Sequence, residues 1–194
     1  MEKKTYSLIA CLEGEEYKKV RGIQKELSEL TGSRKCLEDW QPHITIGDGP
    51  LLSEEELKDY ILALETFVKN NKSVTAKLTD FAGIDNWKGA RENITPYVLW
   101  ANVEVSGDLL NIFNTLRDNL TSKYETWLPR TVNYVPHVTV AFADLDEEGY
   151  RKGLDFLSTK NLNTNFKISH VSIVECYGEG NMTSVEYRRF YFSA

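Results

Sequence analysis

Apolar and polar residues alternate along the chain with two periods, and these periods predict its strands and helices. Short apolar runs, or runs in which every second residue is apolar, are typical of strands. Longer stretches with an apolar residue at every third or fourth position are typical of amphipathic helices. The first part of the chain predicts, in order, a strand at 6–12, a helix at 15–30, a strand at 40–47, a helix at 54–69 and a strand at 74–84.

The same order of elements begins again after a polar stretch. Residues 85–96 are rich in turn-forming side chains and form either a linker or a mobile loop over a cleft. The pattern then predicts a strand at 97–105, a helix at 108–124, a strand at 134–142, a helix at 146–160, a strand at 166–177 and a final strand at 185–192. The last two strands flank a glycine-rich turn and are expected to form a hairpin.

This recurrence predicts an internal repeat within a single domain, residues 1–194. The two copies cover about 5–84 and 97–177, and the strand at 185–192 follows them. His43 of the first copy corresponds to His137 of the second, at an offset of 94 residues. Two such copies most simply pack about a pseudo-twofold axis, which brings matching faces toward one central cleft.

The copies share a motif of proline, histidine, an aliphatic residue, threonine and a second aliphatic residue. It occurs as Pro42-His43-Ile44-Thr45-Ile46 and as Pro136-His137-Val138-Thr139-Val140. Because residues two apart on a strand share a face, the histidine and the threonine of each motif point the same way. A hydroxyl can donate to a phosphoryl oxygen, and an imidazole can move a proton near neutral pH. The predicted catalytic residues are therefore His43, Thr45, His137 and Thr139.

The first strand of each copy indicates what surrounds these residues. One face of both strands is apolar and is expected to face the helices. The other face carries Trp100 in the second copy, which we expect in the cleft, where it can stack on a base.

Three other positions have a functional and a structural interpretation. Arg130, in the sequence Trp127-Leu128-Pro129-Arg130, either brings a cation to the substrate or lies in a surface loop. Tyr177 either walls the cleft or belongs to the core. His170 lacks a threonine two residues on and is expected to be structural.

Composition narrows the class of partner. The net charge of −6 argues against broad contact with duplex nucleic acid, which favours basic surfaces, and favours a small or short substrate.

The three cysteines (Cys11, Cys36 and Cys176) are widely spaced, which predicts reduced thiols in a cytoplasmic protein rather than a disulfide framework or a zinc site. We expect neither a signal peptide nor a membrane helix. Oligomeric state is not predicted.

A metal site is the alternative explanation of the histidine pair. It requires carboxylate or thiolate ligands in addition. Asp48 and Asp144 follow the two histidines by five and seven residues, but neither has the spacing typical of ligand pairs on a helix. We therefore expect no metal and no other cofactor.

In its two His-x-Thr motifs, their preceding prolines and the order of its elements, the chain resembles the two-histidine phosphoesterase superfamily. Members include 2′,5′ RNA ligase-like proteins and cyclic nucleotide phosphodiesterases. The resemblance implies an α+β, bilobal fold with a cleft between antiparallel sheets. It also implies metal-independent cleavage of 2′,3′-cyclic or 2′,5′-linked phosphodiesters, with histidines as acid and base and threonines holding phosphate oxygens. Many RNA ligase-like members carry arginine shortly after the second motif; here Phe142 takes that place, so a cation must come from elsewhere, such as Arg130 or Lys88.

The sequence thus predicts a hydrolase of a 2′-linked phosphodiester that acts on a nucleotide, a short oligonucleotide or a cyclic dinucleotide. Two other hypotheses stay open. One is RNA 2′,5′ ligation or RNA end processing, which the same residues would serve. The other is a non-catalytic nucleotide-binding module that uses the His–Thr pairs as a phosphate clamp.

Overall fold

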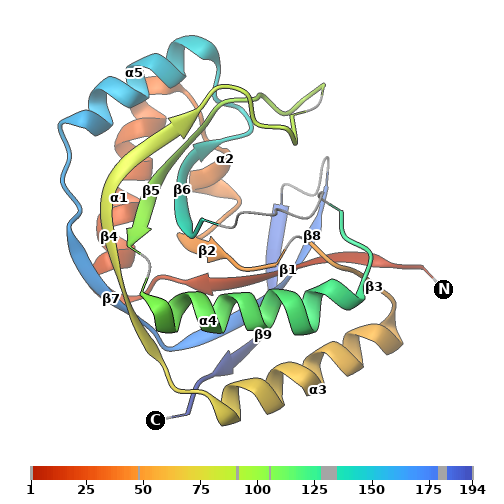
Figure 1. The fold of residues 1–194 in the computed structure, drawn as a ribbon. Helices are drawn as coiled ribbons and strands as arrows, with labels where there is room; N and C mark the ends of the chain where they lie inside the picture. Colours follow the sequence, from red (N-terminus) through yellow and green to blue (C-terminus); the bar gives the residue numbers. More distant parts are fainter. Residues whose placement is uncertain are drawn as a thin grey trace.

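The fold is described from a computed structural model over residues 2–47, 49–90, 92–104, 106–127, 135–178 and 183–193. It combines helices with an antiparallel sheet (Figure 1). The strands are β1 (Lys4–Cys11), β2 (His43–Thr45), β3 (Leu51–Leu52), β4 (Val74–Ile84), β5 (Val98–Glu104), β6 (His137–Phe142), β7 (Thr164–Ile168), β8 (His170–Tyr177) and β9 (Thr183–Tyr191). The helices are α1 (Gly14–Thr31), α2 (Lys35–Glu38), α3 (Glu54–Asn70), α4 (Gly107–Thr115) and α5 (Glu147–Ser158).

The order of the strands across the sheet reads the same from either edge when each strand of one half is replaced by its counterpart in the other half. Within the described part of the chain, the order is β7-β4-β5-β6-β2-β1-β8-β9, and β3 adds to β1. The first four strands form one half of the sheet and the last four form the other. The halves meet at β2 and β6, the strands that carry the two motifs. The α+β, two-lobed arrangement expected from the resemblance is confirmed, with the two lobes joined into one sheet.

One hydrophobic core lies between the sheet and the helices. Figure 1 shows the sheet curled, with the helices on its outer side. The apolar face of β1 (Tyr6, Leu8, Ala10) enters this core, as the sequence predicts. The matching side chains of β5, Leu99 and Ala101, enter it as well. The polar residues of the motifs lie on the opposite, inner face of the sheet.

Helix starts follow the capping signals in the sequence. The Ser53 hydroxyl accepts a hydrogen bond from the Glu56 backbone N–H, and the Glu56 carboxylate accepts one from the Ser53 N–H, so the two residues form a capping box at α3. At α5 the Asp146 carboxylate accepts from the Gly149 N–H at 2.7 Å. Helical turns continue beyond α4 as a π turn (Leu116–Leu120) and a 3-10 turn (Thr121–Lys123).

Two predicted strands differ from the structure in extent. The strand expected at 40–47 is reduced to β2, and the short helix α2, which the sequence did not predict, precedes it. The strand expected at 166–177 is two strands: β7 pairs with β4 in one half of the sheet, and β8 pairs with β1 in the other. The core-facing positions shift by one residue at the break, from Phe166 and Ile168 in β7 to Val171 and Ile173 in β8. In the described residues, no helix is both long and apolar enough to cross a membrane.

Candidate active site

The two motifs lie side by side where the halves of the sheet meet. Ile44 of β2 pairs with Val138 of β6. Continued by one residue in each direction, this antiparallel register sets each histidine across from the threonine of the other strand. Ile44 and Val138 are fully buried in the core, so their polar neighbours lie on the inner face. We call these four side chains the His–Thr quartet: His43, Thr45, His137 and Thr139.

Both histidines are held by the same backbone contact. The Nδ1–H of His43 donates to the carbonyl oxygen of Gln41 at 2.8 Å, and that of His137 donates to the carbonyl oxygen of Val135 at 2.8 Å. A carbonyl can only accept, so in each neutral ring Nδ1 carries the proton and Nε2 carries the lone pair. The Nε2 of His43 lies 3.1 Å from the hydroxyl of Thr45. Both rings therefore present Nε2 for proton transfer.

Burial disfavours the charged form of both rings. The pKa of His43 is lowered to about 4, chiefly by desolvation; the Gln41 carbonyl opposes this shift, and the nearby His137 adds to it. Desolvation also lowers the pKa of His137, and the Val135 carbonyl opposes it. Both histidines are consequently neutral at pH 7 in the free protein.

Each histidine contacts one tryptophan. Trp40 stacks on His43, with ring centroids 4.9 Å apart and an angle of 29° between the planes. Trp100 lies against His137 at 5.4 Å and 51°. The predicted position of Trp100 beside the quartet thus agrees with the structure. Its Nε1–H donates to the side-chain oxygen of Asn102 at 2.8 Å, which fixes the indole.

Trp40 and Gln24 belong to the site as well, although the sequence pattern did not single them out. Trp40 stands three residues before His43, at the start of the stretch that predicts the first motif strand. An aromatic side chain this close to the histidine was the available signal. Gln24 of α1 is buried and donates to the backbone carbonyl of Thr139 at 3.1 Å, which ties the first helix to the second motif. An amphipathic helix pattern gives no signal for such a contact.

The carboxylates of the alternative metal site have other roles or lie outside the described residues. Asp144 accepts hydrogen bonds from the Ser33 hydroxyl at 2.6 Å and from the backbone N–H groups of Arg34 and Lys35 at 2.8 and 3.2 Å. It thereby caps α2 and joins the second motif to the first copy. Asp48 lies outside the described residues. Across the described ranges, no three His, Cys, Asp or Glu side chains are grouped as metal ligands.

A family model described as the 2'-5' RNA ligase superfamily matches residues 13–179, most of the chain. The chain belongs to that superfamily. The resemblance to two-histidine phosphoesterases is thereby confirmed. A search of curated proteins finds no match.

Solved structures show the same fold at low sequence identity. E. coli LigT, solved with 3'-AMP, aligns over 100% of both chains with a TM-score of 0.68 and 13% identity. TT0787 of Thermus thermophilus aligns over 97% of both chains with a TM-score of 0.64 and 15% identity. Usb1 of Kluyveromyces marxianus covers 95% of this chain and 98% of its own, with a TM-score of 0.56 and 14% identity.

Besides Trp100, the predicted substrate-binding residues are Tyr177 and Arg130. Tyr177 is 49% exposed and lies at the end of β8, five residues beyond Ser172, which pairs with β1 next to the quartet. Arg130 lies outside the described residues. Lys88 is exposed and follows Trp87, whose ring packs edge-on against Phe142 at 5.2 Å. An aromatic contact thus occupies the position where many RNA ligase-like members carry arginine.

His170 is buried at 1% exposure, as expected of a structural residue. Its Nδ1 lies 3.1 Å from the Ser169 hydroxyl and 3.7 Å from the Glu13 carboxylate, and its ring lies 5.5 Å from that of Tyr191. These contacts belong to the β8–β9 side of the sheet rather than to the quartet.

Proposed function

We propose that this protein is a phosphodiesterase that hydrolyses a 2′-linked phosphodiester, with His43 and His137 as general acid and base. The observation that carries the proposal is the shared tautomer of the two rings, with each Nδ1–H held by a carbonyl. Two imidazole nitrogens and two hydroxyls on adjacent strands supply the acid, the base and the hydrogen-bond donors of a phosphoryl transfer.

In the proposed reaction, one neutral imidazole takes a proton from water as the water oxygen attacks phosphorus in line. The bond from phosphorus to the departing ribose oxygen breaks, and the other, protonated imidazole gives its proton to that oxygen. The hydroxyls of Thr45 and Thr139 donate to the non-bridging oxygens, where negative charge increases in the transition state. Each imidazole contributes roughly 10²–10⁴ in rate, and positioning supplies much of the remainder. The two histidines are interchangeable in this scheme.

The scheme requires one neutral and one protonated ring, so kcat/KM should depend on pH as a bell. Burial lowers the pKa of both His43 and His137 in the free protein. The pH at which kcat/KM is greatest should therefore shift to more acidic values. We expect this maximum below pH 6.5, the ordinary pKa of histidine.

The proposed substrate is small. The net charge of −6 disfavours a long polyanion, and E. coli LigT has been crystallised with 3'-AMP and with ATP, which supports a ligand of nucleotide size. The candidates are a 2′,3′-cyclic phosphate, a 2′,5′-linked oligonucleotide and a cyclic dinucleotide. Three buried cysteines without a disulfide support the proposed cytoplasmic location: Cys11, Cys36 and Cys176.

The family match favours a second candidate, RNA 2′,5′ ligation or end processing, because the model that matches bears the name of that ligase activity. On an RNA end that carries a 2′,3′-cyclic phosphate, ligation differs from the proposed hydrolysis in its nucleophile, a 5′-hydroxyl in place of water, so the quartet would serve both. The choice of nucleophile is tested by offering RNA ends with a 2′,3′-cyclic phosphate and a 5′-hydroxyl and measuring joined and hydrolysed products.

The main experiment is a substrate panel of 2′,3′-cyclic mononucleotides, 2′,5′-oligoadenylate and cyclic dinucleotides. The wild type should hydrolyse at least one class, and a variant with both His43→Ala and His137→Ala should not. Activity should persist in EDTA, because no step of the proposed reaction uses a metal. Loss of activity on chelation with recovery on added metal would contradict the acid–base assignment. Binding without turnover across the panel would favour the binding-module hypothesis.

A further inference from the structure

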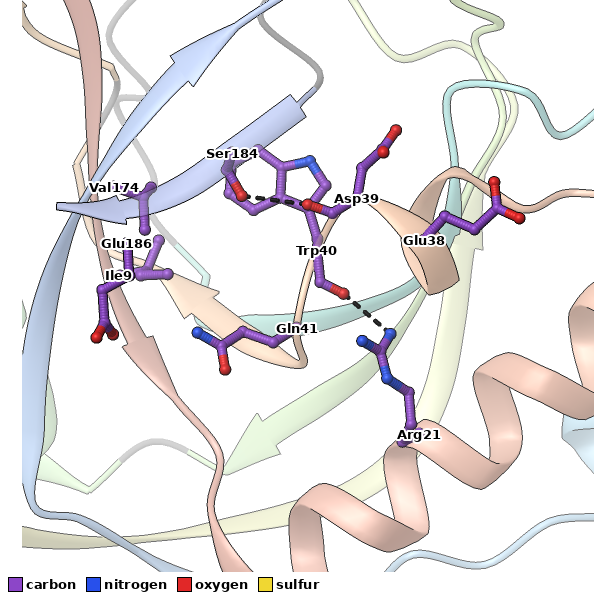
Figure 2. Close-up of a pocket in the computed structure, with 9 residues that line it drawn as sticks. All are labelled: Ile9, Arg21, Glu38, Asp39, Trp40, Gln41, Val174, Ser184 and Glu186. Carbon is purple, nitrogen blue, oxygen red and sulfur yellow. Dashed lines mark hydrogen bonds between the residues drawn. The ribbon is translucent and has the colours of Figure 1, made fainter.

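A pocket adjoins the His43 side of the quartet. Trp40, which stacks on His43, forms one of its walls (Figure 2). Ile9 lines it as well, and Ile9 pairs with Thr45 in the β1–β2 ladder. The pocket is thus one strand away from the place proposed for the phosphate, a separation that the ribose and base of a single nucleotide can span.

Part of the pocket wall is apolar. Ile9 and Val174 belong to a small buried cluster on the inner face of the sheet, and Trp40 packs against it. In Figure 2 the indole of Trp40, Ile9 and Val174 line the same cavity. Aliphatic side chains beside an indole suit a planar ring, because the ring buries one of its faces against them.

The rim of the pocket is rich in carboxylates. Glu38, Asp39 and Glu186 line it, together with one described cation, Arg21. The three carboxylates form ion pairs, respectively, with Arg34, Lys35 and Arg189. Each carboxylate still has lone pairs to spare, since it can accept about four hydrogen bonds. The rim therefore offers acceptors to a ligand.

Arg21 does not act as a phosphate anchor in this arrangement. Its Nη1 donates to the carbonyl oxygens of Cys36 and Trp40 at 3.2 and 2.9 Å, and to the side chain of Gln24 at 3.0 Å. These bonds hold the segment that carries Trp40 (Figure 2). A second phosphate in the pocket would meet three carboxylates and a guanidinium already engaged, so a neutral group with N–H donors fits better.

We propose that this pocket binds the nucleobase of the nucleotide whose phosphate lies at the quartet, and that it selects bases with an exocyclic amino group over uracil. The inference rests on the proposed function and extends it to substrate choice. Adenine, cytosine and guanine present an amino donor to the carboxylate rim. Uracil has no amino group, and its one free ring donor, N3–H, lies between two carbonyl oxygens, which a carboxylate repels.

The kinetic test compares the 2′,3′-cyclic phosphates of adenosine, cytidine, guanosine and uridine. The three amino bases should exceed uridine in kcat/KM by about tenfold, the value of one net hydrogen bond. Glu186→Gln should reduce this ratio at least threefold. Glu13→Gln is the matched control, because Glu13 also pairs with Arg189 but does not line the pocket. A uridine derivative hydrolysed as fast as the others, or equal effects of the two variants, would overturn the inference.

A binding test separates this inference from the proposed function. Adenosine and uridine, which carry no phosphate, are titrated against the wild type and Val174→Phe by NMR, with a melting curve to verify that the variant folds. Adenosine should bind more tightly than uridine, and filling the pocket should weaken adenosine binding at least tenfold. This result can be obtained even if no cyclic phosphate is hydrolysed. In that case the proposed function is wrong, but nucleobase binding in the pocket is still supported. Unchanged adenosine binding in Val174→Phe would rule the pocket out.

Discussion

The two motif strands carry the same residues but different surroundings. Around His137, the inner face is filled: Trp100 of β5 pairs with Thr139, and its indole is fixed by Asn102, which in turn donates to Asp80. Around His43, the equivalent place on β1 is taken by the smaller Ile9. The wall there comes from Trp40, which precedes the strand, and a pocket lies beside it.

This difference separates the proposed chemistry from recognition. Both histidines have the same tautomer and the same carbonyl contact, so the motif and its backbone decide which ring nitrogen is available for proton transfer. The side chains on the neighbouring strands decide how much room is left for a substrate. The pKa of His43 is lowered to about 4, the larger of the two shifts, so the two rings also differ electrostatically.

The largest expected effect comes from removing either imidazole. His43→Ala and His137→Ala should each lower kcat by roughly 10²–10⁴ on the best substrate of the panel. The double variant should lose little more than either single one, because an acid and a base that work together act as one unit. Steady-state kinetics on all three variants, with melting curves to verify folding, make the comparison. Losses that multiply in the double variant would indicate independent roles.

Removing one hydroxyl at a time tests whether the two halves hold the phosphate equally. Thr45→Val and Thr139→Val keep the shape of the side chain and should each lower kcat about a hundredfold, as the loss of one transition-state donor does. KM should change much less. A variant that raises KM and leaves kcat intact would assign that threonine to ground-state binding instead.

The unequal pKa values should appear in the pH dependence of stability. In the unfolded chain a histidine takes up a proton near pH 6.5, whereas folded His43 does so only near pH 4. The free energy of unfolding should therefore decrease as the pH falls from 6.5 to 4, by at most about 3 kcal/mol from this group.

Urea unfolding at several pH values measures this dependence. His43→Gln should flatten the decline more than His137→Gln does, because the pKa of His43 is lowered further. Equal slopes for the two variants would show that the rings are electrostatically equivalent.

The smallest expected effect concerns the contact that joins the two copies. Asp144→Ala removes the hydrogen bonds from the Ser33 hydroxyl and from the backbone of α2, and should destabilise the protein by about 2 kcal/mol. Asp146→Ala is the matched control; it removes a single helix cap and should cost about 1 kcal/mol. Thermal unfolding compares them. A larger loss of stability in Asp146→Ala than in Asp144→Ala would mean that the cap of α5 contributes more than the contact between the two copies.

Local signals allowed much of the fold to be predicted. The capping box at Ser53, the cap at Asp146 and the strand β4 follow from spacing and residue type, since these depend on neighbours in the sequence. The break at Ser169 was not predicted, because it contains no glycine or proline and only a one-residue shift in the apolar alternation marks it. The contact of Gln24 with the Thr139 carbonyl joins residues 115 apart, and helical periodicity holds no information on it.

By itself the sequence determined which side chains share the inner face of the two motif strands, and hence the chemistry proposed for them. It also determined that Trp100 lies on that face. The tertiary structure decided what the sequence could not: that the register of Ile44 with Val138 sets each histidine across from the other strand's threonine. It also placed Trp40 and a carboxylate rim beside only one of the two histidines. Residue type and period act within a strand, whereas the walls of a site come from strands and loops that only folding brings together.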